Sequence, residues 1–355
     1  MKVIIIDNEL MRYRIPIFNM LAQKDGIELT IAHSGKLMQG KVHLLFEEII
    51  LDTYSLSRFV FYKKDLFQYL QSFDIVIASN ELRRLSLMLL PFYRHRNFKI
   101  IFWGIGVRAS YAHRLGASTV WDIIRFYFAK HADALLFYSS FPISIYENKG
   151  IDPKKLFIAN NTVEVSNKLG DAPFQRNRMI FVGSLYKEKK IYQLLKSYLA
   201  VYKRNPLIPC LDVVGDGEEM QAIRNYIDRH ALSSKIILHG AIFDEEKLEE
   251  LFKHAIVCIS PDQAGLSVLK SMAYGVPFIT HKNAITGGER LNIKHNLNGI
   301  LFDKFEDIEL IIEDVIINPS RYLKMGENAK KYYDEFASPE VMVQGFMNAI
   351  LYVKK

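Results

Sequence analysis

The sequence predicts an α/β protein with two domains, each built around a mostly parallel β-sheet. Short apolar runs that are typical of buried strands alternate with helical segments along the chain. The 355 residues, half of them hydrophobic and 24% charged, are enough for two domains of ordinary size with substantial cores. A polar stretch with few apolar residues, 166–178, separates two series of strands and helices and is the expected linker.

The first series occupies residues 1–165 and predicts an amino-terminal domain. Strands are expected at 2–6, 27–32, 74–78, 99–103 and 133–137, with a short sixth strand at 156–159. Intervening helices are expected at 15–22, 66–71 and 120–131. Because strands and helices alternate, the sheet should be parallel and covered on both faces.

The second series occupies residues 179–337 and predicts a carboxyl-terminal domain. Its strands are expected at 179–182, 211–214, near 236–239, and at 255–260, and each is followed by a loop that contains glycine. Helices are expected near 306–317 and 320–335. A last segment, 338–355, contains a helix over 341–352.

The segment from Ser260 to Thr280, SPDQAGLSVLKSMAYGVPFIT, is the most informative part of the chain. Gly265 would let a ligand approach the backbone closely, and a helix is expected to begin near Leu266. The free N–H groups of Gly265, Leu266 and Ser267 would then face the turn at the positive end of the helix dipole, an arrangement that suits phosphate. An ordinary crossover with a glycine turn and no ligand is the alternative.

Three further loops lie at the same predicted sheet edge, where ligands bind in open α/β sheets. The loop after strand 179–182 combines Gly183 with three lysines, and the next two loops also begin with glycine. The residues concerned are Gly183, Lys187, Lys189 and Lys190, then Gly215, Asp216 and Gly217, then Gly240 and Ala241.

The ordered segments FVGSLYKEKKI, VVGDGEE, LHGAIFDEEKLEELF and SPDQAGLSVLKSMAYGVPFIT resemble the donor-binding half of glycosyltransferase family 4 over roughly residues 179–303. The resemblance implies a GT-B fold, with two Rossmann-like domains facing each other across a cleft and a final helix that returns to the first domain. It also implies a retaining enzyme that transfers a hexose from a nucleoside-diphosphate sugar, more often UDP than GDP. The implied acceptor is a glycan or a polyprenyl-diphosphate-linked glycan in bacterial surface polysaccharide or lipopolysaccharide synthesis.

The resemblance assigns nucleotide-sugar binding to residues of these loops. Lys189 matches the lysine that binds the donor phosphates, and Asp262 would accept hydrogen bonds from sugar hydroxyls, so these two are the expected catalytic residues. The alternatives are a solvated lysine for Lys189 and a loop or N-cap aspartate for Asp262. The full expected set is Gly183, Ser184, Lys189, Gly215, Asp216, Gly217, Ala241, Ile242, Asp262, Gly265, Leu266, Ser267, Lys270 and Glu289.

Two positions depart from the family pattern on the donor side. Ser184 stands where the family usually has an arginine, so one positive charge for the phosphates is either missing or supplied elsewhere, by Lys187 or Lys190. Lys270 stands where the family has the carboxylate that binds the ribose hydroxyls, and an ammonium group cannot accept a hydrogen bond. Glu289, which follows two glycines, is expected to reach the ribose instead; for Lys270, a helix lysine with a solvated ammonium group is the alternative.

The acceptor side is expected at the strand end that carries the segment IIFWGIGVRAS. Ile105 stands where many relatives have a histidine, so the motif identifies no base; if the donor's own phosphate takes the acceptor proton, a side-chain base is not obligatory. Trp103 would stack on an acceptor sugar, or else be a large core residue. The expected acceptor-side residues are Arg12, Arg14, Trp103, Gly104 and Ile105.

No metal or cofactor is expected, because no aspartate or histidine spacing fits a metal site. Cys210 and Cys258 lie in apolar strands and indicate a reducing compartment, and no run approaches the ~20 apolar residues of a membrane span. The apolar run at the start of the chain is too short for a signal peptide, so a cytoplasmic location is expected.

Positive charge is concentrated in the first half of the chain. Residues 1–165 hold 21 Lys and Arg against 15 Asp and Glu, which gives +6 of the total charge of +7. This excess favours peripheral contact with anionic lipids at the inner face of the membrane, or else a solvated basic face. Nucleic acid is not an expected partner, because no motif of that kind is present.

Two other functions stay open. A nucleotide-sugar 2-epimerase would share the fold, but it needs acid–base side chains that the sequence does not identify. The substitutions at Ser184, Ile105 and Lys270 would also suit a non-catalytic GT-B subunit that binds a partner or a glycan.

Overall fold

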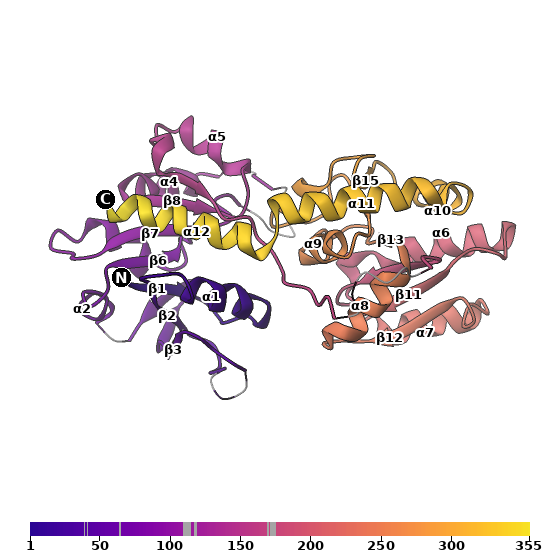
Figure 1. Cartoon of the computed structure of the whole chain (residues 1–355), viewed down its shortest axis with the longest axis horizontal. Coiled ribbons are helices and arrows are strands. Elements are labelled where there is room, and N and C mark those ends of the chain that lie inside the picture. The colour runs from indigo at the N-terminus through magenta and orange to yellow at the C-terminus, as the bar shows by residue number, and fades with distance from the viewer. Residues whose placement is uncertain are drawn as a thin grey trace. The chain divides into compact units, whose positions relative to one another are not determined.

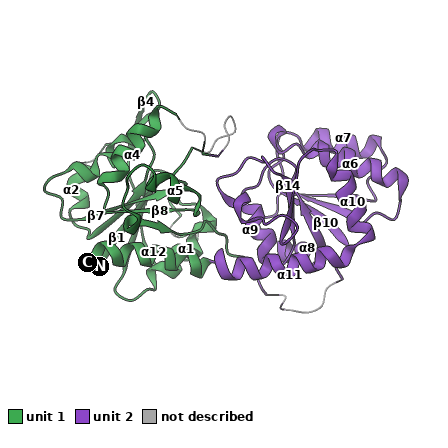
Figure 2. Cartoon of the chain, turned by 90° about the horizontal axis from the view of Figure 1, so that it is seen from above, with its two compact units in different colours: residues 1–109, 116–164, 339–355 green, residues 110–115, 165–338 purple. Residues whose placement is uncertain are grey.

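The computed structural model describes residues 1–38, 40, 42–63, 65–108, 115–116, 119–168, 170 and 175–355. The described chain forms two compact units (Figure 2). Unit 1 contains the described residues of 1–109, 116–164 and 339–355, and unit 2 contains those of 110–115 and 165–338. Residues 169 and 171–174 of the predicted linker lie outside the described residues.

The described part of the predicted linker is attached to unit 2. The Ser166 hydroxyl and the Lys168 backbone N–H both donate hydrogen bonds to the Glu249 carboxylate, at 2.7 and 3.0 Å. The Arg176 guanidinium donates to the carbonyl oxygens of Ala255 and Tyr274, at 2.9 and 2.8 Å. These residues therefore belong to unit 2 rather than to a free connection.

Unit 1 is built on a seven-stranded parallel sheet with the order β3-β2-β1-β6-β7-β8-β9 (Figure 1). Its strands are β1 Lys2–Asp7, β2 Glu28–His33, β3 Glu47–Ile50, β6 Ile75–Ser79, β7 Lys99–Gly104, β8 Ala134–Phe137 and β9 Leu156–Ile158. A separate antiparallel hairpin joins β4 Thr53–Leu56 and β5 Phe59–Tyr62.

Helices bury both faces of this sheet, which explains why its strands are continuous apolar runs. Val3 and Ile5 of β1 pack in one core with α1 (Ile15–Ala22) and α12 (Pro339–Lys354), whereas Ile4 and Ile6 pack in a second core. The helices that contribute to the second core are α2 Leu66–Leu70, α3 Leu85–Met88, α4 Trp121–His131 and α5 Phe141–Glu147.

Every strand predicted for the first half is present within one or two residues. Five short elements were not predicted: β3, β4, β5, α3 and α5. Four of them have only four residues, too few for a hydrophobic period to be recognised; β4 is largely solvent-exposed and β5 is partly buried.

Unit 2 has a six-stranded parallel sheet with the order β12-β11-β10-β13-β14-β15. The strands are β10 Arg178–Val182, β11 Cys210–Val214, β12 Ile236–Gly240, β13 Ala255–Ile259, β14 Phe278–His281 and β15 Gly299–Phe302. The helices are α6 Ile191–Arg204, α7 Met220–Arg229, α8 Glu245–His254, α9 Leu266–Ala273, α10 Asp307–Ile317 and α11 Pro319–Phe336.

This order, 3-2-1-4-5-6 in chain sequence, is that of a doubly wound Rossmann fold. The direction of winding reverses between the neighbouring strands β10 and β13, and loops leaving these two strands turn to opposite faces of the sheet. Ligands of such folds bind in the crevice outside the carboxyl ends of the strands at this reversal. The topology therefore directs attention to the loops after β10 and β13.

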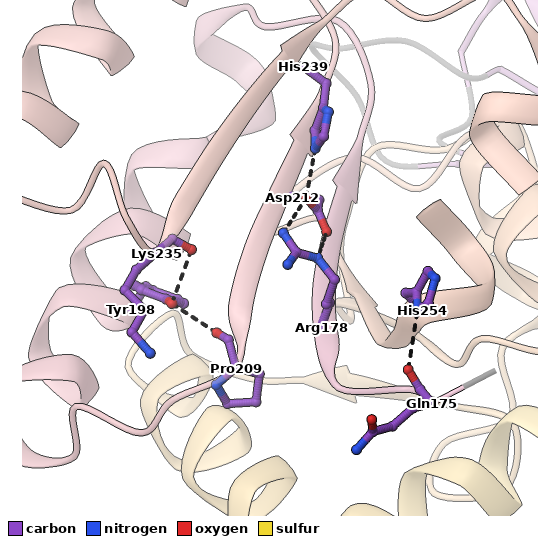
Figure 3. A network of polar contacts seen from close by, with 8 residues as sticks. All are labelled: Gln175, Arg178, Tyr198, Pro209, Asp212, Lys235, His239 and His254. Atoms are coloured by element: carbon purple, nitrogen blue, oxygen red, sulfur yellow. Dashed lines mark hydrogen bonds and ion pairs between the residues drawn. The ribbon is translucent and has the colours of Figure 1, made fainter. Parts of the chain in front are cut away.

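A buried carboxylate ties three strands of this sheet together (Figure 3). Asp212, in the middle of β11, is 1% exposed and pairs with the Arg178 guanidinium of β10. Its other contact is His239 Nε2 of β12, at 2.7 Å. Because each partner comes from a different strand, the cluster fixes the register of β10, β11 and β12.

Within the described residues, no helix combines the length and the apolar character that crossing a bilayer requires. Both cysteines are free thiols. Cys258 is fully buried in β13, and burial raises its pKa to about 12.

Candidate functional site

Side-chain contacts join the loop after β10 to the loop after β13, at the point where the winding reverses. The Tyr186 hydroxyl donates a hydrogen bond to the Gln263 side-chain oxygen. The Lys190 ammonium and the Asp262 carboxylate form an ion pair at 2.5 Å. The two loops thus form one structured edge within unit 2.

The amino end of α9 presents unpaired backbone donors at this edge. Gly265 is the N-cap residue, and no side chain caps the helix. In the described part of the chain, the N–H groups of Gly265, Leu266 and Ser267 make no hydrogen bond, and the Ser267 hydroxyl is buried without a partner. A Cβ built on Gly265 would meet no heavy atom within 4 Å, so space is open above the backbone. The arrangement is that of an anion site.

Lys189 brings a positive charge to the same edge. It ends the short 3-10 helix η4 (Lys187–Lys189), and its Nζ would lie 2.9 Å from a Cβ built on Gly183. The side chain is buried, with 6% exposure, and its ammonium group lies over the Tyr186 ring, 5.9 Å from the centroid, without a hydrogen bond or ion pair among the described residues. Burial lowers its pKa to about 8. A buried ammonium group without a counter-charge is costly, and an anion at this position would offset that cost.

The glycines after β11 have a structural role that the sequence did not predict. A Cβ on Gly215 would lie 1.9 Å from the Gly183 carbonyl oxygen, and a Cβ on Gly217 would lie 2.4 Å from that of Leu185. Both residues therefore allow the loops after β10 and β11 to pack backbone against backbone. Asp216 is exposed between them and accepts the Gly217 N–H on its carboxylate at 2.7 Å.

Lys190 and Asp262 satisfy each other's charge. Besides its ion pair, the Lys190 ammonium lies over the Phe305 ring, 4.6 Å from the centroid. Lys190 is therefore engaged by the protein, and the prediction that it replaces the missing arginine beside Ser184 loses its support. Lys187 is exposed on η4. The N-cap alternative for Asp262 is wrong, because Gly265 occupies that position.

Lys270 makes the contact that sequence reasoning missed. Its ammonium group binds both carboxylate oxygens of Glu245, at 2.7 and 2.8 Å, so the alternative of a freely solvated lysine is wrong. Glu245 is the first residue of α8, directly after the loop that holds Ala241 and Ile242. The only signal in the sequence was the acidic first turn of that helix, a common feature of helices in general.

Glu289 is tied into its own loop. Its carboxylate accepts hydrogen bonds from the Gly287 N–H at 2.9 Å and the Thr286 hydroxyl at 3.2 Å, and the residue is 7% exposed. These contacts give the Glu289 carboxylate a structural role within its own loop. The expectation that Glu289 reaches a ribose gains no support from them.

At the carboxyl edge of the unit 1 sheet, the predicted stacking role of Trp103 is wrong. Trp103 is 3% exposed and packs edge-on against Phe18, Tyr138 and Phe346, which makes it a core residue. Arg14 is also buried, with its guanidinium 4.5 Å above the Trp103 ring and bonded to the Tyr138 hydroxyl at 2.8 Å.

Of the other expected acceptor-side residues, Arg12 is exposed on the 3-10 helix η1 (Arg12–Arg14). Gly104 and Ile105 are partly exposed, and a Cβ on Gly104 would meet nothing within 4 Å. No group of three or more metal-ligating side chains is found within the described residues.

Comparison with known proteins places the site in a family. Residues 168–332 match the family described as "Glycosyl transferases group 1". A curated relative, the poly(glycerol-phosphate) alpha-glucosyltransferase of Bacillus subtilis, is 21% identical over 214 residues. That match covers 58% of this chain but only 31% of the relative, so the chain corresponds to about a third of that protein.

Solved structures resemble the chain over nearly its full length. HepE of Anabaena, in complex with UDP, superposes with a TM-score of 0.72 at 13% identity and covers 99% of this chain and 100% of its own. TarM of Staphylococcus aureus, as a mutant in complex with fondaparinux, alpha-GlcNAc-glycerol and UDP, superposes with a TM-score of 0.69 at 13% identity. The match covers 98% of this chain and 99% of TarM. A glycosyltransferase of Rickettsia africae superposes with a TM-score of 0.73 at 15% identity, covering 99% of this chain and 98% of its own.

At these identities the structural likeness establishes the fold, and the family match is confined to residues 168–332. The match spans the strands and helices of unit 2 that carry Lys189 and the amino end of α9. Residues 168–332 therefore match the glycosyl transferases group 1 family, and the chain has the GT-B fold.

Proposed function

We propose that the protein is a retaining hexosyltransferase that uses a nucleoside-diphosphate sugar, UDP in preference to GDP. The observation that carries this proposal is the buried, unpaired Lys189 ammonium beside Gly183, at the reversal of the sheet where the free amides of α9 also lie. The Lys189 ammonium and the N–H groups at the positive end of the α9 dipole can each donate hydrogen bonds to one phosphate of a nucleoside diphosphate. UDP in the complexes of HepE and TarM supports the choice of base.

In the proposed reaction, the bond between the sugar C1 and the β-phosphate oxygen breaks as the acceptor hydroxyl attacks on the same face. The acceptor proton passes to the leaving phosphate oxygen, so no side-chain base is needed at Ile105. Negative charge grows on the diphosphate during this step. Lys189 and the α9 amides stabilise that charge more strongly in the transition state than in the ground state.

The acceptor in this proposal is a glycan or a lipid-linked glycan of the bacterial surface. The names of the relatives support this class: one glucosylates poly(glycerol phosphate), and WaaB is a lipopolysaccharide outer core galactosyltransferase. WaaB resembles this chain with a TM-score of 0.63 at 16% identity, covering 99% of both chains. The protein would act at the cytoplasmic face of the membrane, where polyprenyl-linked glycans are assembled.

Calorimetric titration with UDP and GDP, followed by an assay of UDP-glucose and UDP-GlcNAc turnover with and without lipid-linked acceptor, tests the proposal. We expect UDP binding and sugar transfer that depends on the acceptor. Nucleotide binding without transfer would instead favour a non-catalytic subunit, and sugar isomerisation without acceptor would favour an epimerase. The absence of binding by either nucleotide would refute the proposal.

A further inference from the structure

We propose that Glu245, held in place by Lys270, is the carboxylate that accepts hydrogen bonds from the ribose hydroxyls of the donor. This inference rests on the proposed function, since it assigns a residue to the nucleoside end of the same site. The position on α9 that the family uses for this contact holds Lys270, which can only donate. The structure brings a carboxylate to that lysine from a different helix.

The pair holds the Glu245 carboxylate at the second turn of α9. Lys270 lies four residues after Leu266, about 6 Å along α9 from the free amides at its amino end. Its side chain is largely buried, with 14% exposure, whereas that of Glu245 is 45% exposed. The lysine is therefore the fixed member of the pair, and the carboxylate is the member that a ligand can reach.

The pair leaves the carboxylate free to bind two hydroxyls. A carboxylate has about four acceptor positions, and the bidentate contact with Lys270 uses two of them. Two remain, which matches the two vicinal hydroxyls of a ribose. Lys270 also offsets the negative charge of Glu245, which would otherwise repel the diphosphate nearby.

The neighbouring residues support a nucleoside at this place. Phe243, two residues before Glu245 in the loop after β12, is 86% exposed and offers an apolar face to a base. The other candidate carboxylate, Glu289, is buried and accepts hydrogen bonds from its own loop. Glu245 is thus the better placed acceptor of the two.

The test compares the binding of UDP, 2′,3′-dideoxyuridine diphosphate and inorganic diphosphate by calorimetry, in the wild-type protein and in Glu245→Gln. We expect the wild type to bind UDP more tightly than the dideoxy analogue. Glu245→Gln should weaken UDP binding by about 10- to 100-fold, the range for hydrogen bonds to a charged group, and lose this discrimination. Binding of inorganic diphosphate should not change.

Four further variants separate recognition of the ribose from a merely structural role of the pair. Glu250→Gln, an exposed position on the same helix, is the matched control and should bind like the wild type. Lys270→Met should weaken UDP binding, and Lys270→Arg should preserve it, because arginine can also bind a carboxylate with two hydrogen bonds. The double variant E245K/K270E keeps the ion pair and returns the carboxylate to α9, so it should recover discrimination against the dideoxy analogue.

Unchanged discrimination in Glu245→Gln would overturn the inference while leaving the proposed function intact. Equal weakening of UDP and inorganic diphosphate would also overturn it, since that result indicates general damage to the loop. If the wild type binds neither UDP nor GDP, the proposed function itself fails, and this is seen before any variant is made.

Discussion

At the scale of one residue, Lys189 is a buried charge whose cost in stability a bound diphosphate would offset. Its ammonium group is buried beside Gly183, and the described residues supply no counter-charge. A pKa lowered from 10.5 to about 8 corresponds to roughly 3 kcal/mol of unfavourable burial. Natural sites that bind anions tolerate such a cost because the ligand reverses it.

Lys189→Met should separate the cost of the buried charge in stability from its contribution to ligand binding. The thioether has a similar length and no charge, so we expect the free energy of unfolding without ligand to rise by about 1–3 kcal/mol at pH 7. UDP affinity and transfer rate should fall by about 100-fold or more. Urea unfolding and titration calorimetry measure the two quantities.

Lys203→Met, an exposed change on α6, is the control and should alter neither the free energy of unfolding nor the UDP affinity strongly. A Lys189→Met protein that is less stable than the wild type would contradict the account of an unpaired buried charge.

The pKa of Lys189 also predicts how pH acts on the protein. Between about pH 8 and 10.5 this lysine binds more protons in the unfolded chain than in the folded one, so its contribution to the free energy of unfolding rises with pH. UDP binding needs the protonated form and should weaken as pH rises from 7 to 9.

Calorimetry of UDP binding at a series of pH values measures this dependence. Lys189→Met should remove it. A UDP affinity in the wild type that stays constant or increases over this range would show that Lys189 does not meet the diphosphate as a cation.

At the scale of secondary structure elements, Asp212 holds three parallel strands in register. Asp212→Asn keeps the shape of the side chain but removes the charge that Arg178 and His239 contact. Both partners are about a quarter exposed, so we expect a loss of about 2–4 kcal/mol rather than the larger cost of a fully buried pair.

Denaturant unfolding, followed by a signal from unit 2, measures this loss. Glu218→Gln, an exposed change in the loop after β11, should cost less than about 0.5 kcal/mol. An Asp212→Asn protein as stable as this control would mean that the three strands are held by packing alone.

The long elements could be predicted from the sequence because their signals are local. Continuous apolar runs predicted β1, β6, β10 and β13, and loops that contain glycine marked the ends of β10 and β13. Short pieces such as the hairpin β4–β5 lack a period and were missed. The start of α9 was correct because Gly265 and the apolar helix after it are adjacent in sequence.

Contacts between distant residues could not be predicted in this way. Lys270 and Glu245 are 25 residues apart, and their contact depends on how α8 and α9 pack. The same reason explains Trp103. Its position at the end of a strand suggested contact with a ligand, but α12, from the far end of the chain, covers it. The local sequence pattern identified the sheet edge, but the partner of each side chain could be identified only from the folded structure.

At the scale of the whole molecule, charge and exposed apolar residues gather in unit 1. Helix α4 exposes Ile123 and Tyr127, and Val120 just before it is also exposed. Arg58 lies 4.9 Å over the ring of Trp121. Aromatic and aliphatic side chains among basic ones are typical of surfaces that bind anionic membranes.

The double variant Val120→Ser/Ile123→Ser should therefore weaken binding to phosphatidylglycerol-containing vesicles by about fivefold or more, as measured by co-sedimentation. Leu207→Ser, which removes an equally exposed apolar side chain from unit 2, should have no effect. Equal binding to neutral vesicles, or no loss in the double variant, would argue against a membrane role for α4.

The central claim is that the loops after β10 and β13 bind a diphosphate through main-chain amides and one lysine. A crystal structure of the protein with UDP tests it most directly. The account predicts phosphate oxygens within hydrogen-bonding distance, about 3 Å, of Lys189 Nζ and of the N–H groups of Gly265, Leu266 or Ser267. UDP bound elsewhere, or phosphates that leave Lys189 without a contact, would contradict it.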